Sequence, residues 1–355
     1  DAERDLTAMG RAAREALLDG ANASPDPEVR ARSRGLLTRA INLEMKARLD
    51  TFLADTEGKY EHDLPGWNRL RATVRGDFSM FGWTWTGKGT VSGKAARELF
   101  VEFLNAPNGR KLLAALGSGA GDLGPAVASL KQELYYARIG RGTAPRAVTA
   151  MEVAVVLFVD SQVRAAGGQR NTLFSSVLTT SGVIQATNGT DGRAQALKAI
   201  LIAWIDTRTD AYEMYSAMNL ASNAGSNDVA VRVAVRLLGS PSATPLYRGY
   251  AFNTLARTQS KEHLPAVEKL IGDETVVTTR STNVGGQIVR TTITLGDMAL
   301  AAAVTMTGQK VDSYHIEDHF KGNGTTSITY TRYSIPEDKR KDAAAKWKAW
   351  RENNP

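Results

Sequence analysis

Short capped turns between amphipathic helices are the feature that most restricts how this sequence can fold. One predicted helix ends near Gly20, and the next begins at the turn formed by Ser24, Pro25, Asp26 and Pro27. Asp26 can cap free amide groups, and Pro27 supplies the fixed φ of a first helical turn. The apolar face of the first helix consists of Leu6, Met9, Ala13 and Leu17. That of the second consists of Val29, Leu36, Leu37, Ala40 and Ile41. Neither helix can bury its apolar face alone, so we expect further helix pairs beside them.

The same pattern returns along the rest of the chain. A helix over 227–238 stops at Gly239, and Thr244 with Pro245 marks the start of another. The valines of 229–235 also alternate as in a strand, but the capped ends favour a helix. Apolar spacing predicts further helices at about 65–74, 94–105, 125–138, 149–163, 172–180, 193–206, 264–271, 298–306 and 337–351.

Three segments have strand-like composition instead. Residues 77–92, 275–294 and 325–335 are rich in Thr, Val, Ile and aromatic residues, which is typical of β-hairpins or extended insertions in loops. The fold class that follows is mainly all-α, with helix pairs stacked into an α-solenoid and short β-hairpins inserted in its loops.

Several blocks of the sequence resemble a known family. The run from Ser24 to Arg30 resembles the turn and second helix of HEAT repeats. Five further blocks look like a group of HEAT-repeat proteins common in planctomycete bacteria; they are 52–67, 94–104, 261–270, 297–309 and 342–350. The resemblance implies a HEAT-like (armadillo-like) α-solenoid and an exported, cell-envelope location, and it implies no biochemical activity. The insertions at 77–92 and around Gly285 are longer than the usual pattern.

These patterns divide the chain into four segments. Residues 1–58 hold one or more N-terminal HEAT-like helix pairs, and 59–150 form a basic helical segment with the insertion at 77–92. Residues 151–225 form a central helical segment. The last segment, 226–355, holds C-terminal repeats with insertions at 275–294 and 325–335 and a terminal amphipathic helix that carries Trp347 and Trp350.

Composition excludes several kinds of chemistry and narrows the partners. The chain has no cysteine, so disulfides, thiolate metal sites and Cys nucleophiles are absent. It contains no uninterrupted apolar stretch long enough to predict a membrane-spanning helix. It begins at Asp1 without a leader, so we expect a processed form or the ordered part of a longer protein. Of the net charge of +7, residues 64–150 carry twelve Lys and Arg against five acids, which is where an acidic partner would bind.

Three motifs approach known chemistry without completing it. His315 and His319 flank two acids, but the pattern is not that of a zinc protease, and we expect a polar loop. Residues 82–90 resemble a phosphate-binding loop, yet Gly89 stands where the Ser or Thr that binds magnesium is required. The glycines of 119–124 precede Pro125 and fit a loop between helices. We therefore expect no enzyme activity, no cofactor and no metal.

Positive charge coincides with aromatic residues in the basic segment. Arg and aromatic side chains are favoured at protein interfaces and on nucleic-acid surfaces. The alternative is that Trp67, Tyr135 and Tyr136 fill the core while the cations are merely solvated. Alternate residues on a short strand point to one face, so Trp83 and Trp85 need a cover from the solenoid or from a partner. The predicted interaction surface is Trp83, Trp85, Lys88, Arg138 and Arg141.

Three functions compete on these observations. The leading hypothesis is a non-catalytic scaffold that binds other proteins, because stacked helix pairs give a long curved surface. The second is a self-assembling structural subunit, either a homo-oligomer or a polymer, joined through strand edges or open solenoid ends. The third is binding of nucleic acid or of another acidic partner through residues 64–150.

Overall fold

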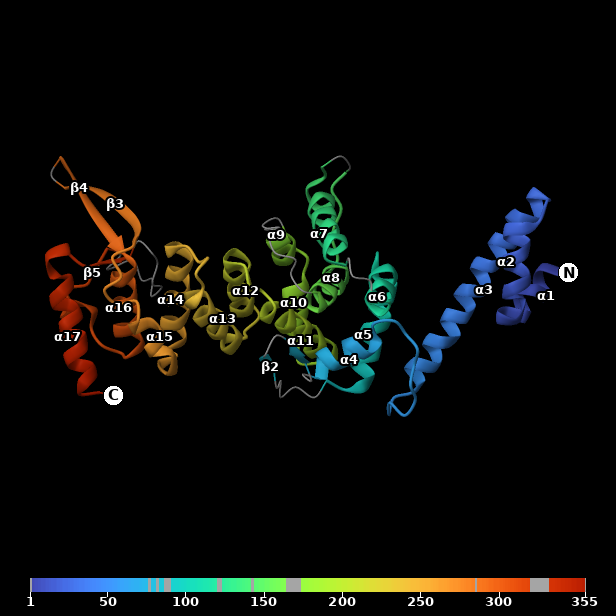
Figure 1. Cartoon of the computed structure of the whole chain (residues 1–355), viewed down its shortest axis with the longest axis horizontal. Coiled ribbons are helices and arrows are strands. Elements are labelled where there is room, and N and C mark those ends of the chain that lie inside the picture. Colours follow the sequence, from blue (N-terminus) through green and yellow to red (C-terminus); the bar gives the residue numbers. More distant parts are fainter. Residues whose placement is uncertain are drawn as a thin grey trace.

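Helices dominate the part of the chain that the structure describes. The computed structural model describes residues 2–75, 78–80, 83–85, 91–119, 123–141, 144–163, 174–284, 286–319 and 332–354. Figure 1 shows an elongated arrangement with the N-terminal helices at one end and α17 (Arg340–Glu352) at the other. The all-α class predicted from the sequence is confirmed.

The N-terminal helices pack around a small core of their own. The elements are α1 (Ala2–Met9), a 3₁₀ turn (Gly10–Ala13), α2 (Arg14–Ala23) and α3 (Pro27–Ala54). Their core consists of Ala13, Leu17, Leu36 and Ala40, and it is separate from the main core. The 3₁₀ turn interrupts what the sequence predicted as one helix. The predicted cap before α3 is confirmed, because the Asp26 carboxylate accepts a hydrogen bond from Glu28 N at 2.8 Å.

The far end of α3 belongs to the main core. Phe52 is fully buried and meets Trp67 edge to face, with 4.7 Å between ring centroids. Trp67 meets Phe100 at 5.5 Å, so this tryptophan fills the core, as one alternative predicted. The helices that follow are α4 (Trp67–Arg75), α5 (Gly93–Asn105), α6 (Gly109–Gly117), α7 (Leu123–Ile139), α8 (Ala150–Gln162), α9 (Phe174–Thr180), α10 (Val183–Thr187) and α11 (Gly192–Asp206). Residues 153–159 of α8 are buried all round because α5, α6, α7 and α11 all contact this helix.

From α11 onward the helices come in pairs. The elements are α11 with α12 (Ala211–Asn223), α13 (Asn227–Gly239) with α14 (Pro245–Thr258), and α15 (Leu264–Glu268) with α16 (Leu295–Met306). Helix α12 packs on α13, α13 on α14, and α14 on α16. In Figure 1, α12, α14 and α16 form one row, and α11, α13 and α15 form a second row below it. Residues 227–239 are helical, so the strand alternative for their valines is wrong.

The first two of these pairs repeat with a shift of 35 residues. In α12 the buried positions Met214, Ala217, Leu220 and Ala221 correspond to the buried Gly249, Phe252, Leu255 and Ala256 of α14. In α11 the buried Ala194, Ala196, Ala199 and Ile202 correspond to Val229, Val231, Ala234 and Leu237 of α13. The same apolar pattern therefore builds both pairs, although few residues are identical.

The described strands form three small antiparallel pairs. They are β1 (Phe78–Met80) with β2 (Trp83–Trp85), β3 (Val276–Val284) with β4 (Gln287–Thr294), and β5 (Glu317–Asp318) with β6 (Tyr333–Ser334). The first two fit the insertions predicted at 77–92 and 275–294. Within the insertion predicted at 325–335, the described residues include only the short strand β6, whose partner is β5; residues 325–331 lie outside the described residues. Figure 1 shows the β3–β4 hairpin projecting from the helices near the C-terminal end.

Helix α17 covers the end of the last helix pair. Trp347 is buried, and its Nε1 donates to Glu268 Oε1 at 3.1 Å. Arg340 makes two hydrogen bonds to the buried carboxylate of Asp297, at 3.0 and 3.1 Å. These contacts tie α17 to α15 and α16. Among the described helices, none combines the length and the apolar character that crossing a bilayer demands.

Candidate interaction surface

Four tyrosines from α12 and α14 pack together at the surface. Tyr215 stacks on Tyr247 with centroids 5.3 Å apart and an interplanar angle of 18°, and it meets Tyr250 at 4.7 Å. Tyr212 approaches Tyr247 at 6.2 Å. All four side chains stay partly exposed. We call Tyr212, Tyr215, Tyr247 and Tyr250 the tyrosine cluster.

Helix capping and the repeat place these rings. Asp210 caps α12 by accepting hydrogen bonds from the backbone N–H groups of Tyr212 and Glu213, at 2.9 and 3.2 Å. Thr244 caps α14 by accepting from Tyr247 N at 3.3 Å. Each helix therefore carries one tyrosine in its first turn and another three residues later, on the same face. The shift of 35 residues that relates the buried positions also relates Tyr212 to Tyr247 and Tyr215 to Tyr250.

Partly exposed, mutually packed tyrosines suit recognition of another molecule. A tyrosine offers a large apolar ring and a polar hydroxyl at little entropic cost, because only two side-chain torsions are fixed on binding. Packing against neighbouring rings fixes those torsions before a partner arrives, which lowers the cost further.

A buried charged network reaches the start of α12, beside Tyr212 of the tyrosine cluster. Asp160 Oδ2 accepts hydrogen bonds from Lys131 Nζ at 2.6 Å, Arg208 at 2.9 Å and Trp204 Nε1 at 2.6 Å. Arg208 is only 2% exposed and also meets Glu213, the neighbour of Tyr212, at 3.3 Å. Burial alone would raise the pKa of Asp160, but the charges of Arg208 and Lys131 hold it below its ordinary value. The network joins α7, α8, α11 and α12 and fixes the start of α12.

The described residues of the predicted surface belong to two different elements, β2 and the end of α7. Trp83 and Trp85 are on β2, opposite Met80 and Phe78 of β1, as a hairpin requires, but their side chains are outside what the structure describes. Lys88 lies outside the described residues altogether. Arg138 and Arg141 are at the end of α7, which rises from the middle of the molecule in Figure 1.

The end of α7 combines positive charge with aromatic and apolar groups. The Arg141 guanidinium lies 5.0 Å from the centre of the Tyr136 ring and donates a hydrogen bond to its hydroxyl at 3.2 Å. Ile139 is 46% exposed between the two arginines. Among the described residues, neither Arg138 nor Arg141 meets a carboxylate. We call Arg138, Ile139 and Arg141 the basic tip.

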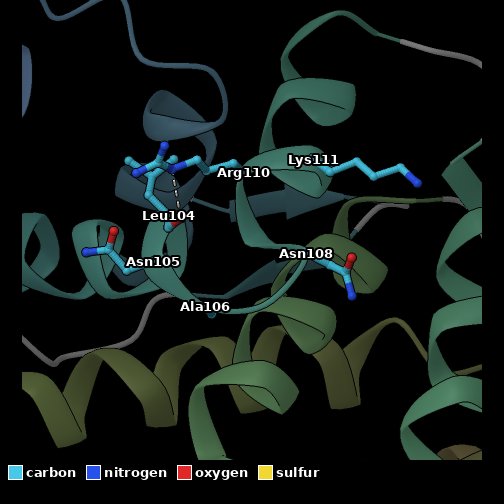
Figure 2. Close-up of a pocket in the computed structure, with 6 residues that line it drawn as sticks. All are labelled: Leu104, Asn105, Ala106, Asn108, Arg110 and Lys111. Atoms are coloured by element: carbon cyan, nitrogen blue, oxygen red, sulfur yellow. Dashed lines mark hydrogen bonds between the residues drawn. The ribbon is translucent and has the colours of Figure 1, made fainter. Parts of the chain in front are cut away.

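A second basic feature lies at the turn between α5 and α6. A hollow of about 440 Å³ is lined by Leu104, Asn105, Ala106, Asn108, Arg110 and Lys111. Gly109 shapes the turn, because a Cβ there would lie 1.8 Å from the carbonyl oxygen of Phe103. Figure 2 shows the Arg110 side chain turned back over Leu104, whose carbonyl accepts from it at 3.3 Å, while Lys111 extends the other way. The polar ends diverge, so they add positive charge to this face without converging on one ligand.

The two histidines of the motif contact different partners. His315 follows a 3₁₀ turn with φ of +56°, so the two rings are not one helical turn apart. His315 Nε2 lies 2.6 Å from Asp342 Oδ2 of α17, whereas His319 Nε2 lies 2.7 Å from Ser334 Oγ of β6. No cluster of three or more potential metal ligands occurs in the described ranges. Of the glycines of 119–124, Gly119 lies in the turn after α6 and Gly124 lies in the first turn of α7, while 120–122 lie outside the described residues. Of the phosphate-loop motif at 82–90, only β2 is described.

The tyrosine cluster was missing from the sequence prediction, although its signal is present. Two Tyr-x-x-Tyr motifs, at 212–215 and 247–250, stand 35 residues apart. Their meaning depends on α12, which the apolar spacing did not predict, and on α12 lying beside α14.

Comparison with protein-family models, with curated proteins and with solved structures finds no match for this chain. The tyrosine cluster and the basic tip are therefore the features from which a function can be argued.

Proposed function

We propose that this protein is a non-catalytic scaffold that binds another protein through the tyrosine cluster, on an α-solenoid of HEAT-like helix pairs. The single observation that carries the proposal is the packing of four partly exposed tyrosines at equivalent positions of two successive helix pairs. Tyrosine is enriched among the few residues that supply most of the binding energy in protein interfaces.

The stacking of the helix pairs supports the solenoid part of the proposal. The first pair contacts the second through α12 and α13, the second contacts the third through α14 and α16, and the buried positions recur with one fixed shift over the first two pairs. In such arrays, equivalent surface positions of successive repeats line up along one face. Tyr212 with Tyr215 and Tyr247 with Tyr250 are such positions. This face therefore presents two adjacent pairs of tyrosine rings to a partner.

The contacts that hold α12 in place support the proposal that the tyrosine cluster binds a partner. Arg208 and Asp160 fix the start of α12, and the Ser175 hydroxyl of α9 donates to Ser216 Oγ at 3.2 Å on the next turn. A surface built on fixed helices pays little reorganisation on binding. This distinguishes the cluster from the exposed Tyr60, which lies in the connection between α3 and α4 and is 70% exposed.

The test uses the full chain with Tyr215→Ala and Tyr247→Ala combined. Proteins captured from an extract of the source cells by the unmodified chain are identified, and the affinity of each is then measured with purified components. We expect the double variant to weaken binding of the cognate partner by about tenfold to a hundredfold, as for central aromatic contacts. The conservative double Tyr→Phe variant should retain most of the affinity, because the rings remain.

Tyr60→Ala is the matched control, since it removes an exposed tyrosine far from the cluster. It should leave the affinity unchanged. Equal binding by the unmodified chain and the Tyr215→Ala/Tyr247→Ala variant, with both folded by circular dichroism, would contradict the proposal.

A further inference from the structure

The outward face of α2 carries unpaired negative charge around an apolar residue. Glu15 and Asp19 are exposed and one helical turn apart, and Leu18 between them is 39% exposed. Neither carboxylate forms an ion pair among the described residues. Residues 1–28 hold seven carboxylates against three arginines, while the other six basic residues of 1–50 lie on α3. We call Glu15, Leu18 and Asp19 the acidic stripe.

The basic tip of α7 has the opposite charge in a similar pattern. Arg138 and Arg141 flank Ile139, as Glu15 and Asp19 flank Leu18. The Tyr136 ring holds the Arg141 guanidinium in place at 5.0 Å, which reduces the freedom lost when a carboxylate binds it. An apolar centre with a charged rim is the usual composition of a protein interface, and opposite charges on the two sides set its register.

The two surfaces do not meet within one chain. Helix α2 packs on α3, and α7 packs on α8 and α9. Figure 1 shows the N-terminal helices at one end of the molecule and α7 rising from its middle, with the length of α3 and the α6 region between them. Helix α3 is continuous from Pro27 to Ala54, so α2 is held away from α7 of the same chain.

The N-terminal helices bury few apolar side chains and leave others exposed, so a second molecule could bury more of them. The apolar cluster there consists of only four buried residues, Ala13, Leu17, Leu36 and Ala40. Five of the nine strongly exposed large apolar residues of the described chain also lie in this part, namely Met9, Leu18, Val29, Ile41 and Leu43. These residues are spread over α1, α2 and α3, and exposed apolar groups gathered in one region mark it as a site of association.

We propose that the acidic stripe of one molecule docks on the basic tip of a second copy of the same chain. The two patches differ, so the contact is head to tail. It joins each molecule to the next and gives an open chain of copies unless the rotation closes a ring. This self-association is separate from the tyrosine cluster, which faces a different partner.

The first test follows mass against concentration and salt by light scattering on the full chain. We expect a mass above 38.3 kDa that rises with concentration. It should fall to the monomer between about 0.01 M and about 1 M salt, because screening shortens from about 30 Å to about 3 Å over that range. A monomer at every concentration in low salt would overturn the proposal.

The second test reverses the charges on each side separately. Glu15→Lys with Asp19→Lys should weaken self-association by about tenfold or more, and so should Arg138→Glu with Arg141→Glu. Mixing these two variants should restore association as chains in which the two variants alternate, because the two reversed surfaces match each other and so do the two unmodified ones. Arg138→Lys with Arg141→Lys retains the charge and is the matched control, which should still associate.

Two results would point elsewhere and contradict the proposal. Association that neither charge reversal affects would assign the contact to another surface. An unchanged monomer that instead binds RNA or DNA at low salt, and loses that binding with Arg138→Glu/Arg141→Glu, would assign the basic tip to nucleic acid. Loss of partner capture by the tyrosine variants with intact self-association would leave this inference standing, so the two proposals can fail independently.

Discussion

Buried charge is where single residues matter most in this protein, and Asp160 is the clearest case. Its carboxylate compensates Lys131 and Arg208, which are 5% and 2% exposed. Asp160→Asn leaves buried Lys131 without its counter-charge and leaves Arg208 with only Glu213, at 3.3 Å, so we expect the free energy of unfolding to fall by about 3 to 5 kcal/mol. Urea denaturation measures the change. The exposed pair of Asp338 and Lys339 provides the control, because Asp338→Asn should cost less than about 1 kcal/mol. Equal losses in the two variants would contradict the role given to Asp160.

A second residue-scale prediction concerns acid stability and Asp55. Burial would raise the pKa of this carboxyl, but hydrogen bonds from His62 and from the backbone of Lys59 and Tyr60, with the charge of Arg97, lower the pKa from 3.8 to about 2. A lowered folded-state pKa adds stability above the unfolded value, and that stability disappears as the pH falls from 3.8 towards 2. The gap in unfolding free energy between the unmodified chain and Asp55→Asn should therefore narrow over this range. A difference in unfolding free energy that does not change with pH would show that Asp55 stabilises the fold through packing and not through its charge.

At the scale of an element, α17 depends on one of its two tryptophans. Trp347 is 4% exposed and bonded to Glu268, whereas Trp350 is only partly buried on the next turn. We expect Trp347→Ala to lower the free energy of unfolding by about 3 to 5 kcal/mol, as for large core truncations. Trp350→Ala is the matched control and should cost clearly less. Denaturant titration of both variants decides the point, and a reversed order would mean that α17 packs through its other face.

The elements also show how far sequence patterns reach. Helix α3 with its Asp26 cap, helix α13 and the β3–β4 hairpin could be predicted, because capping residues and apolar or β-branched spacing act locally. Helix α12 could not, since Tyr212, Tyr215 and the serines and asparagines within it have weak helix propensity, and packing against α13 decides its conformation.

The candidate site was harder to predict than the fold for a related reason. The tyrosine cluster forms only when α12 and α14 lie side by side, and the Asp160 network joins residues 29, 44 and 48 positions apart in the chain. Such contacts have no local signature. Arg138 and Arg141 of the basic tip, in contrast, were named from the sequence because they lie in the basic segment, and their role in binding stays a prediction.

At the scale of the whole molecule, the two separate cores predict two different rates of amide hydrogen exchange. The core of Ala13, Leu17, Leu36 and Ala40 is small, whereas α8 is buried on all sides. Amide hydrogens of α1 and α2 should therefore exchange with solvent by local opening, far faster than those of α8. Leu17→Ala should accelerate exchange in α1 and α2 and leave α8 unchanged, as measured by hydrogen–deuterium exchange with mass spectrometry. Equal acceleration in α8 would mean that the chain opens as one unit.

Helix α3 belongs to both of these cores, and that has a geometric consequence. Its 28 residues give a rod of about 42 Å at about 1.5 Å per residue, which carries Leu36 into one core and Phe52 into the other. If copies join through α2 and α7, the length of α3 sets the distance from one molecule to the next. Lengthening it by one residue would also turn the acidic stripe by about 100° around the axis, so distance and phase along such an assembly are encoded in a single uninterrupted helix.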